Sequence, residues 1–107
     1  MIMIKRVLIS VYDKTGIIHF ARGLTELGVE IIATDGTFAA LQRGGIEAIE
    51  RVSHVTKTPE ILDGRVKTEH TKIMGGILAQ RENIEHVNEL RRLEINPFDM
   101  VVQLLSV

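Results

Sequence analysis

Apolar runs alternate with helical patterns through the first half of this chain, and this alternation limits the folds that are open to it. Runs rich in β-branched residues cover 5–12, 29–33 and 46–49. Between them, apolar residues recur at helical spacing over 17–27 and 38–41. Strands joined by short helical connections form parallel sheets with right-handed crossovers and helices on the faces. The pattern therefore predicts a three-layer α/β fold around a parallel sheet.

The second half of the chain is less regular. The segment 50–72 is polar, which is typical of a functional or mobile loop when a loop is this long. Residues 73–79 then predict a fourth strand, in which the Gly75-Gly76 pair weakens the pattern or marks close approach by a ligand or backbone. A helical pattern over 84–93 and an apolar run over 98–105 follow. We therefore expect five parallel strands.

The composition favours one folded domain over 1–107 and disfavours several kinds of site. The 13 basic and 14 acidic residues form no run of one sign, so we expect no nucleic-acid-binding surface. The absence of cysteine excludes disulfides and fits a reducing compartment, so we expect a cytoplasmic protein. No apolar run approaches membrane-spanning length, so we expect no membrane partner. The four histidines have no metal-ligand spacing, and we expect no metal: His19, His54, His70 and His86.

Hydroxyl, glycine and lysine side chains follow the first two predicted strands. In open parallel sheets, ligands bind outside the carboxyl ends of the strands. Each of these turns leads into a helix N-terminus, whose free N–H groups and dipole favour an anion. The groups are Ser10, Lys14 and Thr15 after the first strand, and Thr34, Gly36 and Thr37 after the second. Together they predict a cradle for the phosphate of a small molecule, with capping and turn formation as the simpler alternative.

A charged stretch over 62–72 lies between the two halves of the pattern. If it runs extended, Arg65 and Lys67 point the same way and suit one anionic group, with the Thr68 hydroxyl beside them. His70 follows and could exchange protons near neutral pH. The alternative is a solvated surface loop, and the charges alone do not decide between the two.

Four motifs in this order resemble one known family. They are S-V-Y-D-K-T-G at 10–16, T-D-G-T at 34–37, P-E-I-L-D-G-R-V-K-T at 59–68 and G-G-I-L-A at 75–79. They resemble the N-terminal IMP cyclohydrolase domain of the bifunctional purine-biosynthesis enzyme (AICAR transformylase/IMP cyclohydrolase). That domain has the methylglyoxal-synthase-like fold, so the resemblance implies a five-stranded sheet in the order 3-2-1-4-5.

The resemblance also implies a reaction, the closure of 5-formamidoimidazole-4-carboxamide ribotide to IMP with loss of water. It implies no cofactor and no metal. In the family's pattern, Lys67 lies near the reacting end as the catalytic residue. The nucleotide-binding positions are Lys14, Thr34, Gly36, Thr37, Arg65 and Thr68, while Ser10 and Thr15 support the phosphate turn.

This chain departs from the family at several positions. Tyr12 replaces a usual serine, Asp35 a glycine, and Met74 a histidine. Residues 103–107 replace the family's N-L-Y-P-F run, which removes its tyrosine. The family's downstream aspartate and proton-transferring lysine have no counterpart here, so a second copy or a separately encoded C-terminal half is an expected partner.

Other functions therefore stay open. One is a non-catalytic module of the same fold that binds phosphate or nucleotide as a regulator. Another is a methylglyoxal synthase, and the last is a decayed copy without function. In the first of these alternatives the partner is still a purine nucleotide or another phosphorylated small molecule.

Overall fold

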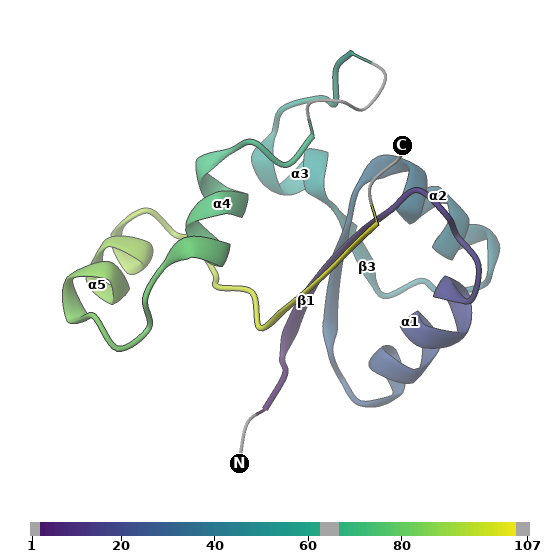
Figure 1. Cartoon of the computed structure of the whole chain (residues 1–107), viewed down its shortest axis with the longest axis horizontal. Coiled ribbons are helices and arrows are strands. Elements are labelled where there is room, and N and C mark those ends of the chain that lie inside the picture. The colour runs from purple at the N-terminus through teal and green to yellow at the C-terminus, as the bar shows by residue number, and fades with distance from the viewer. Residues whose placement is uncertain (1–2, 63–66, 105–107) are drawn as a thin grey trace.

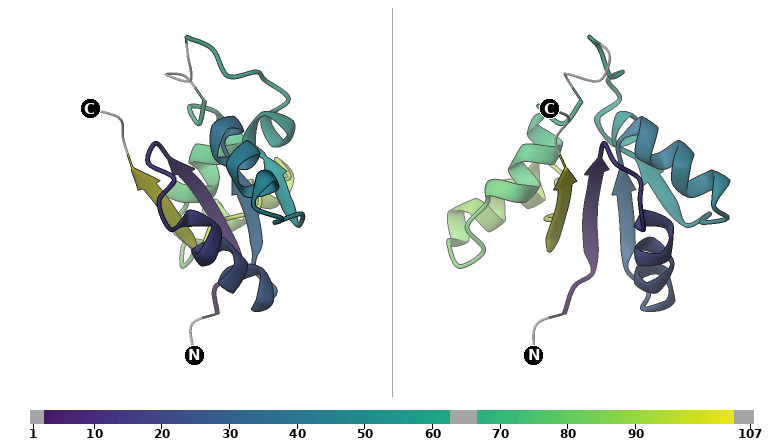
Figure 2. Two further views of the ribbon diagram at one scale, coloured as in Figure 1. Left: turned by 90° about the vertical axis from the view of Figure 1, so that its right-hand side faces the viewer. Right: turned by 45° about the vertical axis from the view of Figure 1, so that its right-hand side comes forward.

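A computed structural model describes residues 3–62 and 67–104. Its centre is a parallel sheet of four strands in the order β3-β2-β1-β4. The strands are β1 (Arg6–Val11), β2 (Glu30–Ala33), β3 (Ile49–Arg51) and β4 (Met100–Leu104). Helices lie on both faces, so the molecule has the three layers expected for a parallel α/β protein (Figures 1 and 2). The α/β fold class predicted from the sequence is confirmed.

One face of the sheet is covered by α1 (Ile17–Glu26) and α2 (Asp35–Arg43). Alternate β1 residues such as Val7 and Ile9 point into this layer, where they pack with Leu41 and are fully buried. The long apolar run of β1 therefore reflects a strand covered on both sides, as expected for parallel sheets.

The opposite face carries a smaller core. Here α3 (Val52–Thr56) and α4 (Thr71–Leu78) pack on the sheet, and Ile73 contacts the cluster formed around Leu8 and Ile32. The fifth helix, α5 (Ile84–Arg92), lies beyond α4, away from the sheet, and contributes no buried residue (Figure 1). In the described part of the chain, no helix has the length and apolar character needed to cross a membrane.

The prediction of a strand over 73–79 was wrong, because these residues belong to α4. The His70 side chain caps this helix by accepting from the Lys72 N–H. Ile73 and Gly76 are three residues apart and both buried, which is helical spacing. The five expected strands are therefore four in the described residues, and the run expected as the fifth strand is β4, next to β1.

The Gly75-Gly76 pair is explained by backbone packing. A Cβ at Gly76 would lie 2.8 Å from the carbonyl oxygen of Asn96, and the Gly76 carbonyl accepts from the Phe98 N–H at 2.9 Å. The close approach of a backbone, one of the two readings of this pair, is therefore what occurs. It lets α4 lie against the segment that leads into β4.

Several element bounds also differ from the sequence predictions. The third strand is Ile49–Arg51 rather than 46–49, and α2 already begins at Asp35. The segment 50–72, expected to be a loop, contains the short helix α3. Asp13 does not cap α1; Gly16 does, with a φ of 75° that only glycine adopts easily.

Asp99 joins the start of β4 to the start of β1. Its carboxylate accepts from the N–H groups of Lys5 at 2.7 Å and Arg6 at 2.9 Å, and it pairs with the Arg81 guanidinium at 2.7 Å. Burial raises the pKa of the Asp99 carboxyl, but these donors outweigh burial and hold it below its usual value of 3.8. The ionised form of Asp99 therefore stabilises this end of the sheet.

We predict that Gly76→Ala destabilises the fold by about 1–3 kcal/mol, because the new methyl group must displace the Asn96 backbone. Gly23→Ala in α1 is the matched control. Its Cβ meets no atom within 4 Å, and alanine should stabilise the helix by about 0.5–1 kcal/mol. Urea unfolding of both variants measures these changes, and equal effects in the two would contradict the packing role of Gly76.

We also predict that Asp99→Asn costs roughly 1–2 kcal/mol near neutral pH, because it removes a charge-assisted network. The folded pKa is depressed, so the stabilisation is present above the unfolded value of 3.8 and is lost as the pH falls through the folded value. The difference in unfolding free energy between wild type and variant should therefore shrink as the pH falls below 3.8. A difference in unfolding free energy that does not change with pH would show that the ionised Asp99 carboxylate is not the source of the stabilisation.

Candidate functional site

Three hydroxyl groups meet where β1 and β2 end. Thr34 donates its hydroxyl toward Ser10 Oγ at 3.2 Å and lies 3.4 Å from Thr37 Oγ1. Thr37 Oγ1 also accepts from the Val11 N–H at 3.2 Å. All three side chains are buried, Thr37 with only 1% of its surface exposed. The start of α2 is thus tied to the end of β1, and three of the predicted residues are brought together.

The N-terminus of α2 already holds a carboxylate. Glu60 Oε2 accepts from the Asp35 N–H at 2.6 Å. No hydrogen bond among the described residues engages the N–H groups of Gly36 and Thr37. An acidic oxygen at this position fits the partial positive charge of a helix start, and further donors remain beside it.

The Asp35 side chain is held by α3. Its Oδ1 accepts from the Ser53 hydroxyl at 2.9 Å. Neither Ser53 nor Glu60 was predicted as part of the site. Glu60 belongs to the P-E-I-L-D-G motif, which could have drawn attention to it, whereas Ser53 carries no comparable signal in the sequence.

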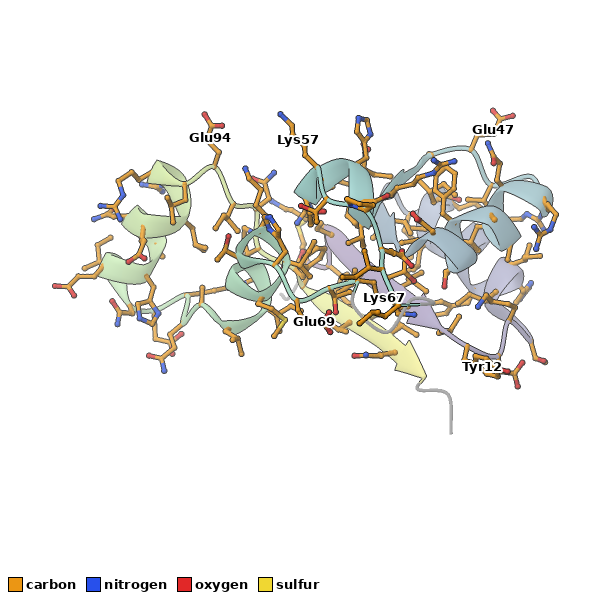
Figure 3. All side chains as sticks on the ribbon, turned by 90° about the horizontal axis from the view of Figure 1, so that it is seen from above. Tyr12, Glu47, Lys57, Lys67, Glu69 and Glu94 are labelled. Carbon is orange, nitrogen blue, oxygen red and sulfur yellow. The ribbon has the colours of Figure 1, made fainter. Side chains whose placement is uncertain are left out.

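Lys14 and Lys67 place two ammonium groups near each other from distant parts of the chain. Lys14 Nζ donates to the carbonyl oxygens of Val11 and, at 3.1 Å, Tyr12. Partial burial lowers the pKa of Lys14 below its usual 10.5, and the charge of Lys67 lowers it further, against the opposing charge of Asp13. Figure 3 looks onto this edge of the sheet and shows Lys67 extending across it. Two cations held together in this way favour an anionic ligand.

The turn between β1 and α1 is stabilised from within. Asp13 Oδ1 accepts from the Thr15 N–H at 2.9 Å and from its hydroxyl at 2.7 Å. These hydrogen bonds lower the pKa of the Asp13 carboxyl below its usual 3.8. Thr15 therefore supports the turn and does not contact the buried hydroxyl groups. Tyr12, at the tip of the turn, leaves 72% of its surface exposed (Figure 3).

A cavity of about 640 Å³ lies beside Lys67, between the sheet, α4 and the segment that precedes α4. In the strand register Ser10 pairs with Gln103 and Leu8 with Val101, so these side chains share one face of the sheet. Ser10 of the hydroxyl cluster thus lies on the same face of the sheet as the cavity. The lining residues are Leu8, Thr68, Glu69, His70, Thr71, Met74, Ile77, Val101 and Gln103.

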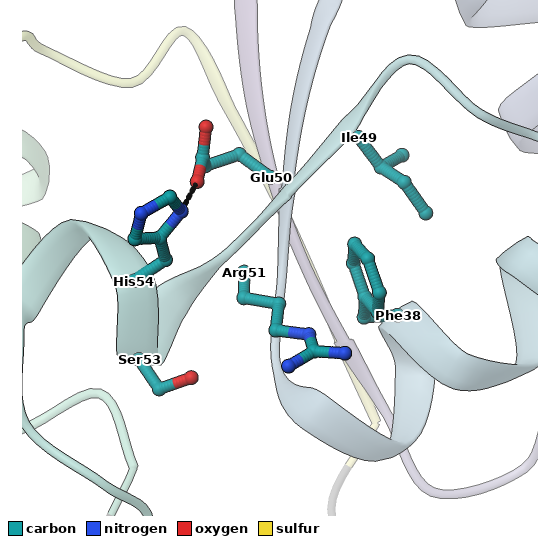
Figure 4. A pocket seen from close by; sticks show the side chains of 6 residues that line it. All are labelled: Phe38, Ile49, Glu50, Arg51, Ser53 and His54. Atoms are coloured by element: carbon teal, nitrogen blue, oxygen red, sulfur yellow. Dashed lines mark ion pairs between the residues drawn. The ribbon is translucent and has the colours of Figure 1, made fainter.

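A second cavity, of about 510 Å³, lies at the β3 edge (Figure 4). The Arg51 guanidinium stacks over the Phe38 ring at 4.5 Å, and Glu50 pairs with His54 four residues later. None of the predicted site residues lines this cavity. The charged side chains that line this cavity are already paired with neighbouring side chains, so it offers a ligand fewer free polar groups than the cavity beside Lys67.

The remaining predicted residues divide as follows. Thr68 lines the larger cavity, and Gly36 lies in the first turn of α2. Arg65 lies outside the described residues. Within 3–62 and 67–104, no group of three or more acidic, histidine or cysteine side chains is arranged to hold a metal ion.

We predict that Lys67→Met raises the pKa of Lys14, because one of the two causes that lower it is removed. Burial remains, so the pKa should stay below 10.5. Titration followed by the NMR shifts of the lysine side chains measures this. Lys72→Met is the matched control, since Lys72 Nζ donates to Glu94 on the α5 side. If the pKa of Lys14 is the same in wild type and in Lys67→Met, the two ammonium groups do not lie near each other.

Comparison with known proteins identifies relatives over nearly the whole chain. The family model described as MGS-like domain matches residues 16–106. The chain is 56% identical over 100 residues to the bifunctional purine biosynthesis protein PurH of Caldicellulosiruptor bescii, and 57% identical to PurH of Clostridium acetobutylicum. Each alignment covers 94% of this chain, which spans about a fifth of the length of these relatives, in their N-terminal region.

A solved structure gives the same result for the fold. The crystal structure of ForH superposes with a TM-score of 0.84 at 33% sequence identity, covering 98% of this chain and 54% of that one. The resemblance read from the four motifs is therefore confirmed. Since the family model covers most of the sequence and the fold agrees, the chain belongs to the MGS-like domain family.

Proposed function

We propose that this chain binds a purine nucleotide and takes part in purine biosynthesis, as the cyclohydrolase step that closes the pyrimidine ring of IMP. One observation carries the proposal: Lys14 and Lys67 lie near each other, and the neighbouring buried hydroxyl cluster lies on the same face of the sheet as the cavity. A cationic, anion-binding end beside a less polar pocket matches a nucleoside monophosphate. The naming of the relatives as purine biosynthesis proteins supports the pathway.

The phosphate would be held by the groups around the α2 N-terminus. The N–H groups of Gly36 and Thr37 supply donors, and Lys14 supplies charge. Charge-assisted bonds of this kind are stronger than neutral ones. Glu60 occupies one donor of the helix, so an incoming phosphate either shares this helix start with the carboxylate or displaces it.

The base would lie in the cavity of about 640 Å³, a volume within the range of small-molecule sites. Leu8, Ile77 and Val101 give apolar walls suited to a flat heterocycle. Thr68 and Gln103 add polar groups at its margin. Pockets with apolar walls and a few polar groups are typical of small-molecule recognition.

In the proposed reaction the carboxamide nitrogen of the formylated precursor attacks the formyl carbon and closes the ring. The carboxamide nitrogen gives up one proton and the formamide nitrogen gives up another, and the formyl oxygen takes up both and leaves as water. The Lys67 ammonium, which lies near Lys14 and directly precedes the cavity-lining Thr68, would stabilise negative charge on the formyl oxygen. Holding both groups of one molecule in contact supplies the remaining acceleration.

A second candidate is a binding module without chemistry. The observation that favours it is the lining of the cavity, in which Glu69 and His70 are the ionisable groups. Among the described residues that line it, no lysine is paired with an aspartate for proton transfer. Both candidates require nucleotide binding, and only the first requires turnover.

Calorimetric titration with IMP, AMP and inorganic phosphate tests the binding that both candidates share. We predict that IMP binds more tightly than phosphate, and that Lys14→Ala and Lys67→Ala each weaken it by roughly 1.5–3 kcal/mol, the usual cost of losing a charge-assisted bond. Arg92→Ala on the exposed face of α5 removes a cation far from the cavity and should leave affinity unchanged. Equal losses in all three variants would point to nonspecific attraction.

Formation of IMP from the formylated precursor, followed in a stoichiometric assay, separates the candidates. Turnover above the uncatalysed rate that disappears in Lys67→Ala supports the cyclohydrolase. Binding of IMP without any turnover would leave the binding module as the function.

A further inference from the structure

His70 has a fixed tautomer in this structure. Its Nδ1 accepts a hydrogen bond from the Lys72 N–H at 3.1 Å and so caps α4. A ring nitrogen that accepts cannot carry a proton. In the neutral imidazole the proton must then be on Nε2, on the other side of the ring.

The Nε2–H group has no hydrogen-bond partner in the described part of the chain. Among the described residues, the hydrogen bond to Lys72 is the one that His70 makes through its side chain. The residue is partly buried and lines the cavity of about 640 Å³, with Thr68 on one side and Met74 on the next turn of α4. A donor of known position therefore borders the space in which the proposed function puts the base.

We propose that His70 contacts the ligand and that its Nε2–H donates to an oxo group or a ring nitrogen of the base. Its Nδ1, which caps α4, keeps the ring in the orientation that this requires. The inference rests on the proposed function, since it requires a base in the cavity. The proposed function assigns roles to the phosphate-binding groups and to Lys67 but none to His70, and this inference supplies one. The cap makes the donor pre-organised, because the ring needs no rearrangement when a ligand enters.

The chain itself suggests a substitution that separates the two roles. Asn83 caps α5 with a side-chain oxygen that accepts from Glu85 and His86 N–H groups at 2.9 and 3.2 Å. His70→Asn therefore keeps an acceptor for the α4 cap, since asparagine is among the preferred N-cap residues, but it is too short to present the Nε2 donor. His70→Ala removes both. His86→Asn is the matched control, because His86 Nδ1 also accepts a backbone hydrogen bond, from Gln80, and lies outside this cavity.

The experiment measures the binding of IMP and of ribose 5-phosphate to the four proteins by calorimetry, together with their thermal midpoints. We expect His70→Asn to keep the midpoint of wild type and to lose about threefold to tenfold in IMP affinity, the value of one neutral hydrogen bond. Its affinity for ribose 5-phosphate, which has no base, should not change. His70→Ala should lose both IMP affinity and thermal stability, and His86→Asn should keep wild-type affinity for both ligands.

NMR of the imidazole nitrogens gives an independent readout. IMP should shift the His70 Nε2–H resonance, identified by its absence in His70→Asn, and ribose 5-phosphate should not. If wild type binds IMP and His70→Asn binds it equally well, the role of His70 is overturned while the proposed function stands. If wild type binds ribose 5-phosphate as tightly as IMP, no base is recognised, and the proposed function fails before His70 is tested.

Discussion

The pairing of β1 with strands on both of its sides is the interaction on which the rest of the structure depends. All six residues of β1 are buried, and the strand pairs in parallel with β2 and with β4. Because parallel neighbours end at the same edge, the pairing brings the Ser10, Thr34 and Gln103 positions to one place. The hydroxyl cluster and the larger cavity both follow from that arrangement. A slip of one residue in register would turn Ser10 to the other face.

The charged groups at this edge come from distant parts of the chain. Two lysines that are 53 positions apart in the printed sequence interact closely enough to depress the pKa of Lys14. Glu60 lies at the start of α2 and supplies the negative charge that this helix end favours. The two lysines repel each other, and the Glu60 carboxylate is favoured at the N-terminus of α2. Both features indicate where an anion would be stabilised. The acidic Asp35, unexpected beside a phosphate cradle, is held by Ser53 on the neighbouring helix.

The helix α4 shows how one segment serves fold and site together. Its Gly76 allows backbone contact with Asn96 and so fixes the helix against the start of β4. Its capping residue, His70, and its outward Met74 then form one wall of the cavity. The sequence pattern over 73–79 is ambiguous, because a short apolar run has no period that separates a strand from a buried helix. The cap by His70 and the packing of Gly76 favour the helix. The cap depends on the orientation of the His70 side chain, and the packing of Gly76 depends on Asn96, which is distant in sequence.

The sequence by itself determined the fold class, the strands at the centre of the sheet and the turns that carry the hydroxyl and lysine groups, because local periodicity and turn chemistry encode them. Its motifs also identified the family. Only the tertiary structure decided that 71–78 is a helix, that Lys14 and Lys67 meet, and that Glu60 and Ser53 join the site. These features depend on contacts between segments far apart in the chain, and such contacts leave no periodic signal in the sequence.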